Sequence, residues 1–293
     1  MQKKNNKINS QEIGLDIAMS LAKFVTGKEN LHYGYWENLE VKLENFGKAQ
    51  EAFTEKILSY ISYISNKKKL KILDIGGGAG ETAKILHDLG HEVTIIIPSK
   101  ILAEKARKNT KGNTKIEITT FEDYKIKTNK KFDLCLFFES FQYIRIDTSL
   151  NKTKEILNKD GQILIADCFR SKNYSALNKR PPGGGHELSK FYKKIKELNL
   201  KIVSYEDITF FVSPSIDLEQ KFYNTIGFIY NRIEKELLSK KPFLFNFLKL
   251  IFKISLKKNK RKRLKDRLFK SERNSKTFQE NNSYIIISLK TES

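Results

Sequence analysis

The chain has 293 residues, 39% of them hydrophobic and 11% aromatic, so it has enough apolar residues for one large domain or two small ones. Its 55 Lys and Arg residues outnumber 34 Asp and Glu residues, and the net charge of +21 favours polyanionic partners, either nucleic acid or an anionic membrane surface. Two cysteines and four scattered histidines, with no Cys-x-x-Cys pair, exclude a disulfide framework and a zinc site, and we expect no metal.

The first 66 residues are predicted to form a helical cap ahead of the main domain. Residues 1–10 are a polar tail without the apolar stretch of a signal peptide. Apolar spacing predicts helices over 11–26 and 44–64, and the loop between them carries HYGYW at 32–36. Because no apolar run reaches the roughly 18–20 residues of a membrane span, we expect a cytoplasmic protein with reduced thiols.

Residues 67–210 alternate short apolar runs with amphipathic helices. Strands that are apolar throughout are typical of a parallel sheet covered on both faces, and their alternation with helices predicts a doubly wound α/β domain. Cys135 and Cys168 fall inside such strands and are expected to be core thiols. The predicted strands of the whole chain are 70–75, 93–97, 116–119, 132–138, 162–168, 202–205 and 283–289.

Residues 211–278 do not follow this alternation, and we interpret them as a helical insertion before the final strand, which lies within 279–293. Residues 242–256 are apolar on nearly all sides, whereas the stretch 253–276 has twelve basic residues against two acidic ones, a net of +10. This pattern indicates a cap over a hydrophobic pocket, or a peripheral contact with an anionic membrane through 242–270. The alternative is a helix packed on the sheet with solvated Lys and Arg side chains.

The strongest motif is LDIGGGAGET at residues 73–82, which follows the first strand and begins a helix. Glycines allow a tight turn and a close approach of a ligand to the main chain, and a helix N-terminus offers free N–H groups. The G-x-G-x-x-G dinucleotide fingerprint is excluded because Glu81 occupies its third glycine position, and there is no Gly-Lys-Ser/Thr P-loop. An acid followed by three alternating glycines fits the cationic ligand S-adenosylmethionine (SAM): Asp74, Gly76, Gly78 and Gly80.

With three further segments, this motif resembles the class I SAM-dependent methyltransferases that act on small molecules. HYGYW resembles a loop of members acting on lipids, quinones, sterols and amines, FDLCLFFESFQY at 132–143 resembles their fourth strand, and LNKDGQILIAD at 157–167 resembles their glycine turn and fifth strand. The resemblance covers about residues 30–210 and the last strand. It implies a Rossmann-like, mostly parallel seven-stranded sheet with N-terminal helices and an insertion, and SAM as the cofactor.

The resemblance also implies cofactor contacts at the strand ends. Glu122 or Asp123 is expected to contact the adenine, and Glu139 is expected to border the ligand at the end of the fourth strand. The acid that holds the ribose hydroxyls in many members is missing after the second strand, and Ser99 or a backbone group beside Pro98 is expected to replace it. This departure predicts weaker SAM binding or a ribose that is held differently.

Two residues are candidates for catalysis. The aromatic face of Tyr33 would stabilise a sulfonium by roughly 0.5–2 kcal/mol. His186 follows three glycines, 183–185, that are expected to form a loop able to move or to lie against a ligand. A histidine titrates near neutral pH, so His186 is the candidate general base, with an ordinary position at the start of a helix as the alternative.

Tyr35, Gln142 and Tyr143 are candidate substrate contacts, with core packing as the alternative for Tyr143, and Trp36 is expected to pack. We therefore predict an enzyme that transfers the methyl group of SAM to a small, hydrophobic or lipid-like acceptor by in-line displacement. The alternative is an RNA methyltransferase or a basic RNA-binding protein. It is less favoured, and a nucleic-acid partner is not expected, because aromatic residues are not interleaved with the basic cluster. A non-catalytic protein of the same fold is a third class.

Overall fold

The computed structural model describes residues 10–66, 68–125, 131–176 and 181–291, so nearly all of the polar tail expected at 1–10 lies outside the described residues. The elements in chain order are α1 (Ser10–Thr26), η1 (Leu43–Asn45), α2 (Phe46–Ser65), β1 (Lys71–Ile75), α3 (Glu81–Asp88), β2 (Glu92–Ile96), α4 (Lys100–Asn109), β3 (Lys115–Glu117), β4 (Phe132–Phe138), η2 (Phe141–Tyr143), α5 (Ile146–Ile156), β5 (Leu157–Arg170), η3 (Lys172–Ala176), α6 (Leu188–Glu197), β6 (Leu200–Asp207), α7 (Thr209–Val212), α8 (Pro214–Lys240), α9 (Pro242–Ser255), α10 (Lys258–Phe269), α11 (Ser275–Asn281) and β7 (Asn282–Thr291).

The seven strands form one sheet in the order β3-β2-β1-β4-β5-β7-β6. Strands β1 to β5 pair in parallel, whereas β7 runs antiparallel to both β5 and β6. This confirms the predicted doubly wound, mostly parallel, seven-stranded sheet. Because β1 lies between β2 and β4, the strand order reverses there, and the carboxyl ends of β1 and β4 define the crevice where such sheets bind ligands.

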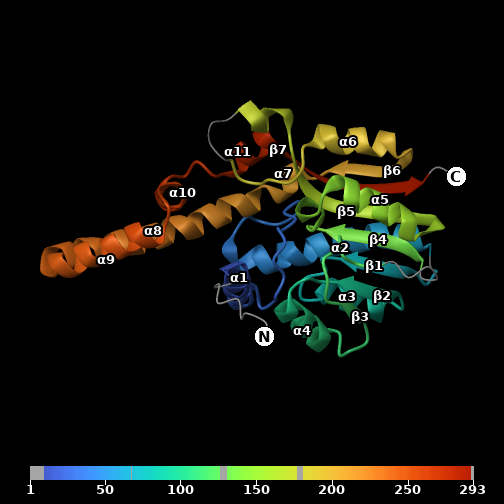
Figure 1. The fold of residues 1–293 in the computed structure, drawn as a ribbon, viewed down its shortest axis with the longest axis horizontal. Helices are drawn as coiled ribbons and strands as arrows, with labels where there is room; N and C mark the ends of the chain where they lie inside the picture. Colours follow the sequence, from blue (N-terminus) through green and yellow to red (C-terminus); the bar gives the residue numbers. More distant parts are fainter. Residues whose placement is uncertain (1–9, 67, 126–130, 177–180, 292–293) are drawn as a thin grey trace, which may run out of the picture.

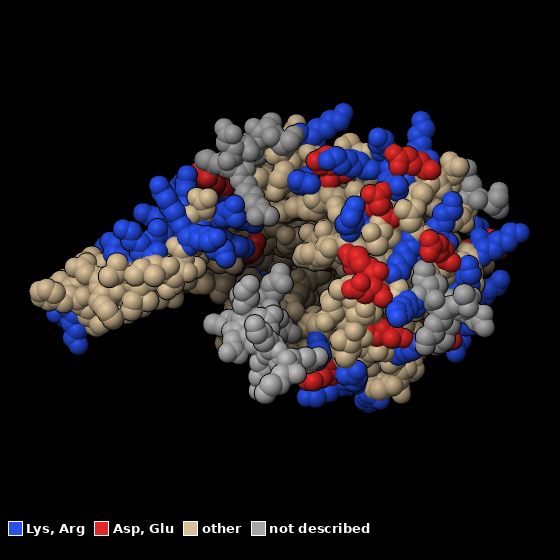
Figure 2. All heavy atoms as spheres, viewed as in Figure 1, with Lys and Arg blue, Asp and Glu red and all other residues tan. Residues whose placement is uncertain are grey.

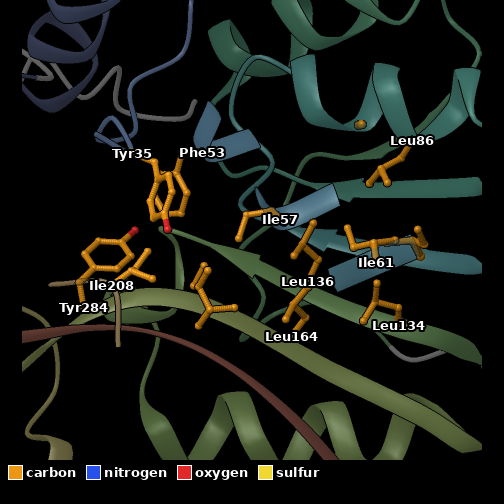
Figure 3. Close-up of a cluster of buried hydrophobic side chains, with 14 of the residues drawn as sticks. Tyr35, Phe53, Ile57, Ile61, Leu86, Leu134, Leu136, Leu164, Ile208 and Tyr284 are labelled. Atoms are coloured by element: carbon orange, nitrogen blue, oxygen red, sulfur yellow. The ribbon is translucent and has the colours of Figure 1, made fainter. Parts of the chain in front are cut away.

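Helices lie on both sides of the sheet (Figure 1), and a hydrophobic cluster lies on each face. On one face, Ile61 of α2 and Leu86 of α3 belong to one buried cluster with Leu136 of β4, part of which Figure 3 shows. On the other face, Leu150 of α5 and Phe191 of α6 lie in a second buried cluster. Successive side chains of a strand point to opposite faces, so a strand between two layers must be apolar throughout, which is the pattern in the sequence.

Two apolar segments are less buried than a core pattern predicts. On α1, Ile17 is 56% exposed and Phe24 is 89% exposed, whereas Met19 is fully buried. On β6, Ile202 and Val203 are both exposed. β6 lies at the edge of the sheet, where a strand has a neighbour on one side only.

Helices α8, α9 and α10 project away from the sheet and confirm the predicted helical insertion before the last strand (Figure 1). We call these helices, residues 214–269, the arm. Helix α10 lies close against α8. A Cβ on Gly227 of α8 would be only 2.3 Å from the carbonyl oxygen of Leu268 of α10, so only glycine fits there. Arg267 of α10 also forms an ion pair with Glu219 of α8. The arm is therefore a packed helical unit rather than a loose loop.

Candidate functional site

The glycine loop joins β1 to α3 at the point where the strand order reverses. Gly76, Gly78 and Gly80 have φ values of 79°, 54° and 79°, a region that glycine adopts without steric cost. A Cβ on Gly76 would lie 2.5 Å from Cβ of Ser140, and one on Gly80 would lie 2.9 Å from Cβ of Ala106. A Cβ on Gly78 would meet no atom of the described residues within 4 Å, so Gly78 borders open space. The first turn of α3 directs free N–H groups to this end of the loop.

Asp74 lies beneath the glycine loop and is 2% exposed. Its Oδ2 atom would be 2.3 Å from a Cβ on Gly77, so the carboxyl group touches the loop. Within the described residues this Oδ2 has no hydrogen-bond partner, and burial raises the pKa of Asp74 to about 7. An unpartnered buried carboxylate is costly. The loop and this carboxylate therefore fit a positively charged ligand that also accepts main-chain hydrogen bonds, as SAM does.

Glu139 follows β4 with a φ of 55°, a backbone conformation that residues other than glycine rarely adopt. Its Oε1 accepts hydrogen bonds from the N–H of Tyr33, at 3.1 Å, and from the hydroxyl of Tyr284, at 2.7 Å. Burial raises the pKa of Glu139 to about 8, with Asp167 adding to the rise and the two hydrogen bonds opposing it. The adjacent Ser140 donates a hydrogen bond to the last carbonyl of β1, which places Glu139 beside the glycine loop.

A second buried acid, Asp167 of β5, and its neighbour Tyr284 were not among the predicted site residues. The Oδ2 atom of Asp167 accepts from the N–H of Gln142 at 2.9 Å, and Oδ1 accepts from the N–H of Cys168 at 2.7 Å. Burial raises the pKa of Asp167 to about 7, against these hydrogen bonds. The signal in the sequence was an acid at the end of an apolar strand, the same signal that identified Asp74.

Tyr33 lies beside Glu139, to which its backbone N–H donates a hydrogen bond. Its ring packs edge-to-face on Tyr284 with centroids 6.1 Å apart. Burial and the nearby Glu139 raise the pKa of the Tyr33 hydroxyl well above its usual range, so it stays protonated. His32 fixes the backbone here, because its Nδ1 lies 2.8 Å from the carbonyl oxygen of Tyr33.

The rest of the HYGYW loop packs into the core. Tyr35 is 6% exposed, stacks on Phe53 and donates its hydroxyl hydrogen to Glu37 at 2.9 Å. Trp36 donates from Nε1 to the hydroxyl of Ser215 at 2.9 Å, which is the packing role expected for it. The structure thus brings Tyr33 to the acids but gives Tyr35 contacts of a packing residue rather than of a substrate contact.

His186 is held by the loop that follows β4. Its Nε2 lies 2.7 Å from the carbonyl oxygen of Ile144 and 3.1 Å from that of Phe141. Carbonyl oxygens only accept hydrogen bonds, so Nε2 carries a hydrogen and Nδ1 is the only nitrogen able to take up a proton. The carbonyl of His186 accepts from the N–H of Arg170 at 2.7 Å. The preceding glycines are fixed on the ends of β5 and β7 and do not form a detached loop.

Replacing Gly185 with alanine is expected to lower the free energy of unfolding by more than about 2 kcal/mol. Gly185 has a φ of 80°, and a Cβ there would be 1.8 Å from the carbonyl oxygen of Cys168. The matched control is Gly184→Ala, because the nearest atom to a Cβ at 184 is 4.0 Å away. Urea denaturation measures both variants, and equal stabilities would contradict the close approach at Gly185.

Three predicted cofactor contacts lie beyond β2 and β3. Ser99 caps α4, with its hydroxyl oxygen accepting from the N–H of Leu102 at 3.3 Å. Glu122 and Asp123 are exposed, and the Oδ2 atom of Asp123 accepts from the hydroxyl of Thr120 at 2.8 Å. These residues belong to the β2–β3 side of the sheet, whereas Glu139 and Asp167 belong to the β4–β5 side.

The two predicted substrate contacts after β4 differ in exposure. Gln142 is partly buried and its side-chain oxygen faces Gly184, 4.0 Å from the position of a Cβ there. Tyr143 is 79% exposed, which excludes core packing for its ring. Both residues lie in η2, which Asp167 holds through the N–H of Gln142. Figure 2 shows a hollow in the molecule between the base of the arm and the body of the sheet domain.

Comparisons with known proteins agree with this fold and loop. Residues 73–165 match the family described as methyltransferase domain. The ubiquinone biosynthesis O-methyltransferase of Pelagibacter ubique is 32% identical over 136 residues, which are 43% of this chain and 57% of that protein. The geranyl diphosphate C-methyltransferase of Streptomyces coelicolor has the same fold, with a TM-score of 0.59 and 12% identity over 99% of this chain and 100% of its own. A cyclopropane synthase of Mycobacterium tuberculosis has a TM-score of 0.61 and 12% identity over 98% and 99%.

The sheet has the fold of the class I SAM-dependent methyltransferases, and residues 73–165, which contain the glycine loop, match the methyltransferase domain family. Both named methyltransferases, of Pelagibacter ubique and of Streptomyces coelicolor, are similar to this chain in sequence or in fold. The chain spans little more than half the length of the Pelagibacter relative. Within the described residues, no group of His, Cys, Asp or Glu is arranged to hold a metal ion.

Proposed function

We propose that this protein transfers the methyl group of SAM to a small, hydrophobic or lipid-like acceptor. The observation that carries the proposal is the glycine loop itself: Gly78 borders open space, and the buried Asp74, whose Oδ2 atom has no hydrogen-bond partner among the described residues, touches the loop at Gly77. A cationic ligand at this place compensates the buried carboxylate, and the loop offers main-chain N–H groups to its other end. When bound, SAM supplies an electrophilic methyl group on a sulfonium sulfur.

The residues of this chain bind the cofactor and orient the acceptor. Asp74 and the glycine loop bind one end of the cofactor, and Ser99 with Glu122 or Asp123 is proposed for the ribose and adenine. The ring of Tyr33 stands beside the acids and offers an aromatic face to the sulfonium. Gln142 and Tyr143 are proposed to contact the acceptor from η2.

We propose Glu139 as the group that takes up the proton when an oxygen or nitrogen acceptor is methylated. A base works best when its pKa lies near the working pH, and burial raises the pKa of Glu139 to about 8. His186 remains the other candidate, through Nδ1. Glu139 is favoured because the next residue, Ser140, donates a hydrogen bond to the carbonyl of Ile75, directly before the glycine loop.

The acceptor is proposed to be hydrophobic on two grounds. Two of the similar proteins are named for ubiquinone biosynthesis and for geranyl diphosphate. The arm beside the site also presents many exposed apolar side chains. We accordingly propose a cytoplasmic location in peripheral contact with a membrane.

Isothermal titration calorimetry with SAM, and with its demethylated product, tests the first part of this proposal. Both ligands are expected to bind the purified chain at one site. Absence of heat with either ligand at about 1 mM would overturn the proposal, since such weak binding is worth less than about 4 kcal/mol. Incubating a cell extract with SAM labelled on the methyl carbon then identifies the acceptor, which is expected in the organic phase.

A further inference from the structure

We propose that the arm docks on an anionic lipid bilayer, with α9 embedded in the interface and α10 lying over the headgroups. This inference rests on the proposed function. Docking of the arm would hold the crevice of the methyltransferase next to acceptors that are dissolved in the membrane. Among the helices of the described residues, none combines the length and hydropathy needed to cross a bilayer. The contact must therefore be peripheral.

Helix α9 carries the apolar part of this surface. It is 14 residues long and its charged residues are Lys249 and Lys253. Phe243 is 90% exposed, Phe247 61% and Ile254 76%. Monomeric proteins rarely leave so many large apolar side chains on one exposed element. At about 1.5 Å per residue the helix is about 21 Å long, shorter than the roughly 30 Å hydrocarbon core, which suits a helix lying in the interface.

Helix α10 carries the charged part. Its sequence, KNKRKRLKDRLF, has a single acid, Asp266, and Lys258, Lys260 and Lys262 are all exposed. Among the described residues, no salt bridge joins these three lysines to an acid. Figure 2 shows Lys and Arg gathered over the part of the arm nearer the sheet domain, while the far end is almost free of charge. An apolar end flanked by a basic region complements an anionic bilayer, whose headgroups cover an apolar interior.

Packing within the arm fixes α10 against α8, and α9 follows α8 after a single residue, Lys241. Arg267 pairs with Glu219, and Gln220 donates to the carbonyl of Arg267 at 2.9 Å. Asn224 donates to the hydroxyl of Ser271 at 2.9 Å, which ties the chain after α10 to α8. The arm therefore presents both surfaces as one unit anchored to the methyltransferase core.

The charge distribution disfavours other occupants of this surface. Two copies of the chain docked arm to arm would bring two strongly basic helices together, which costs free energy at ordinary salt. RNA would complement α10 but would leave the apolar α9 in water. A bilayer that contains anionic lipid satisfies both parts at once.

Vesicle flotation tests the proposal with the full chain. Wild-type protein is expected to float with vesicles of phosphatidylcholine and phosphatidylserine, and at least tenfold less with phosphatidylcholine alone. The variant Phe243→Ser/Phe247→Ser/Ile254→Ser is expected to lose at least tenfold in binding. The variant Lys258→Glu/Lys260→Glu/Lys262→Glu is expected to lose as much, and wild-type binding should weaken as salt is raised.

The matched control is Lys190→Glu/Lys193→Glu/Lys196→Glu, which makes the same charge change on the exposed face of α6 and should leave flotation unchanged. Equal loss in this control would show that net charge alone attracts the protein, and would overturn the assignment to the arm. Failure of the wild type to float would overturn the whole proposal, whether the arm then proved to bind RNA or a second copy of the chain. Calorimetric binding of SAM should be the same in every variant, so this test and the test of the methyltransferase function can fail separately.

Discussion

Replacing Gly78 with leucine is expected to weaken SAM binding at least about 100-fold, or about 2.8 kcal/mol, in a protein that still folds. A side chain at 78 meets no described atom within 4 Å, so it enters the space that the cofactor is proposed to fill. The positive φ of 54° adds a cost of about 1–2 kcal/mol to folding, which most domains tolerate. Calorimetry measures the binding, and urea denaturation confirms that the variant is folded.

Gly90→Leu is the matched control for this experiment. Gly90 also has a positive φ, 92°, and a Cβ there also meets no described atom within 4 Å, but it lies in the turn after α3 and not in the glycine loop. The two variants should therefore lose similar stability, while Gly90→Leu keeps SAM binding. Unchanged binding in Gly78→Leu would place the cofactor elsewhere and remove the basis of the proposed function.

In the wild type the free energy of unfolding is expected to fall as pH rises from 5 to 8. Replacing Glu139 with glutamine is expected to make this fall less steep. Burial raises the pKa of Glu139 from 4.5 to about 8, so within this window the folded protein keeps a proton that the unfolded chain has released. The free energy of unfolding then falls as pH rises, by about 1.4 kcal/mol per pH unit for this group. Glutamine keeps an oxygen for the donors Tyr33 and Tyr284 but does not titrate. Urea denaturation at several pH values measures the difference.

The contrast should be clearest between pH 7 and 8. Burial raises the pKa of Asp74 and of Asp167 only to about 7, from 3.8, so below pH 7 these carboxyl groups contribute a slope of the same sign in both proteins. Glu122→Gln removes an exposed carboxylate and should keep the wild-type profile. Identical profiles for Glu139→Gln and the wild type would show that Glu139 is ionised throughout.

Methyl transfer gives a second measurement for the same variant, once the acceptor is identified. Glu139→Gln is expected to lower kcat by about 100-fold or more, because a positioned base contributes that much. In the wild type, kcat should rise with pH as the carboxyl group loses its proton near pH 8. If His186→Asn lost activity while Glu139→Gln stayed active, proton transfer would belong to His186.

The sequence predicted the parts of the site that depend on local backbone geometry. Alternating glycines after an apolar strand predict a turn with positive φ, because glycine adopts positive φ without steric cost. Gly76, Gly78 and Gly80 all have positive φ. The same holds for the alternation of strands and helices, because the period of the apolar residues reflects which faces are covered. For this reason the strand bounds were predicted within two residues, except for the start of β5, which is at Leu157 instead of residue 162.

The sequence did not reveal which distant side chains meet. Glu139 lies 106 residues from Tyr33 and 145 from Tyr284, and no local pattern connects them. His186 was judged by its intrinsic chemistry, but the carbonyls that hold its Nε2 come from another loop. The apolar spacing of α1 indicated an amphipathic helix, yet Ile17 and Phe24 stayed exposed because another face of the helix packs inward.

By itself, then, the sequence determined the cofactor loop, the strand pattern and the charge of the arm, because each depends on neighbours along the chain. The tertiary structure alone decided that Asp74 lacks a partner, that Glu139 joins Asp167 and Tyr284, and that α9 stays exposed beside α10. Burial and hydrogen bonding between segments far apart in sequence depend on how the sheet and helices pack, and the same packing decides the pKa values of these acids.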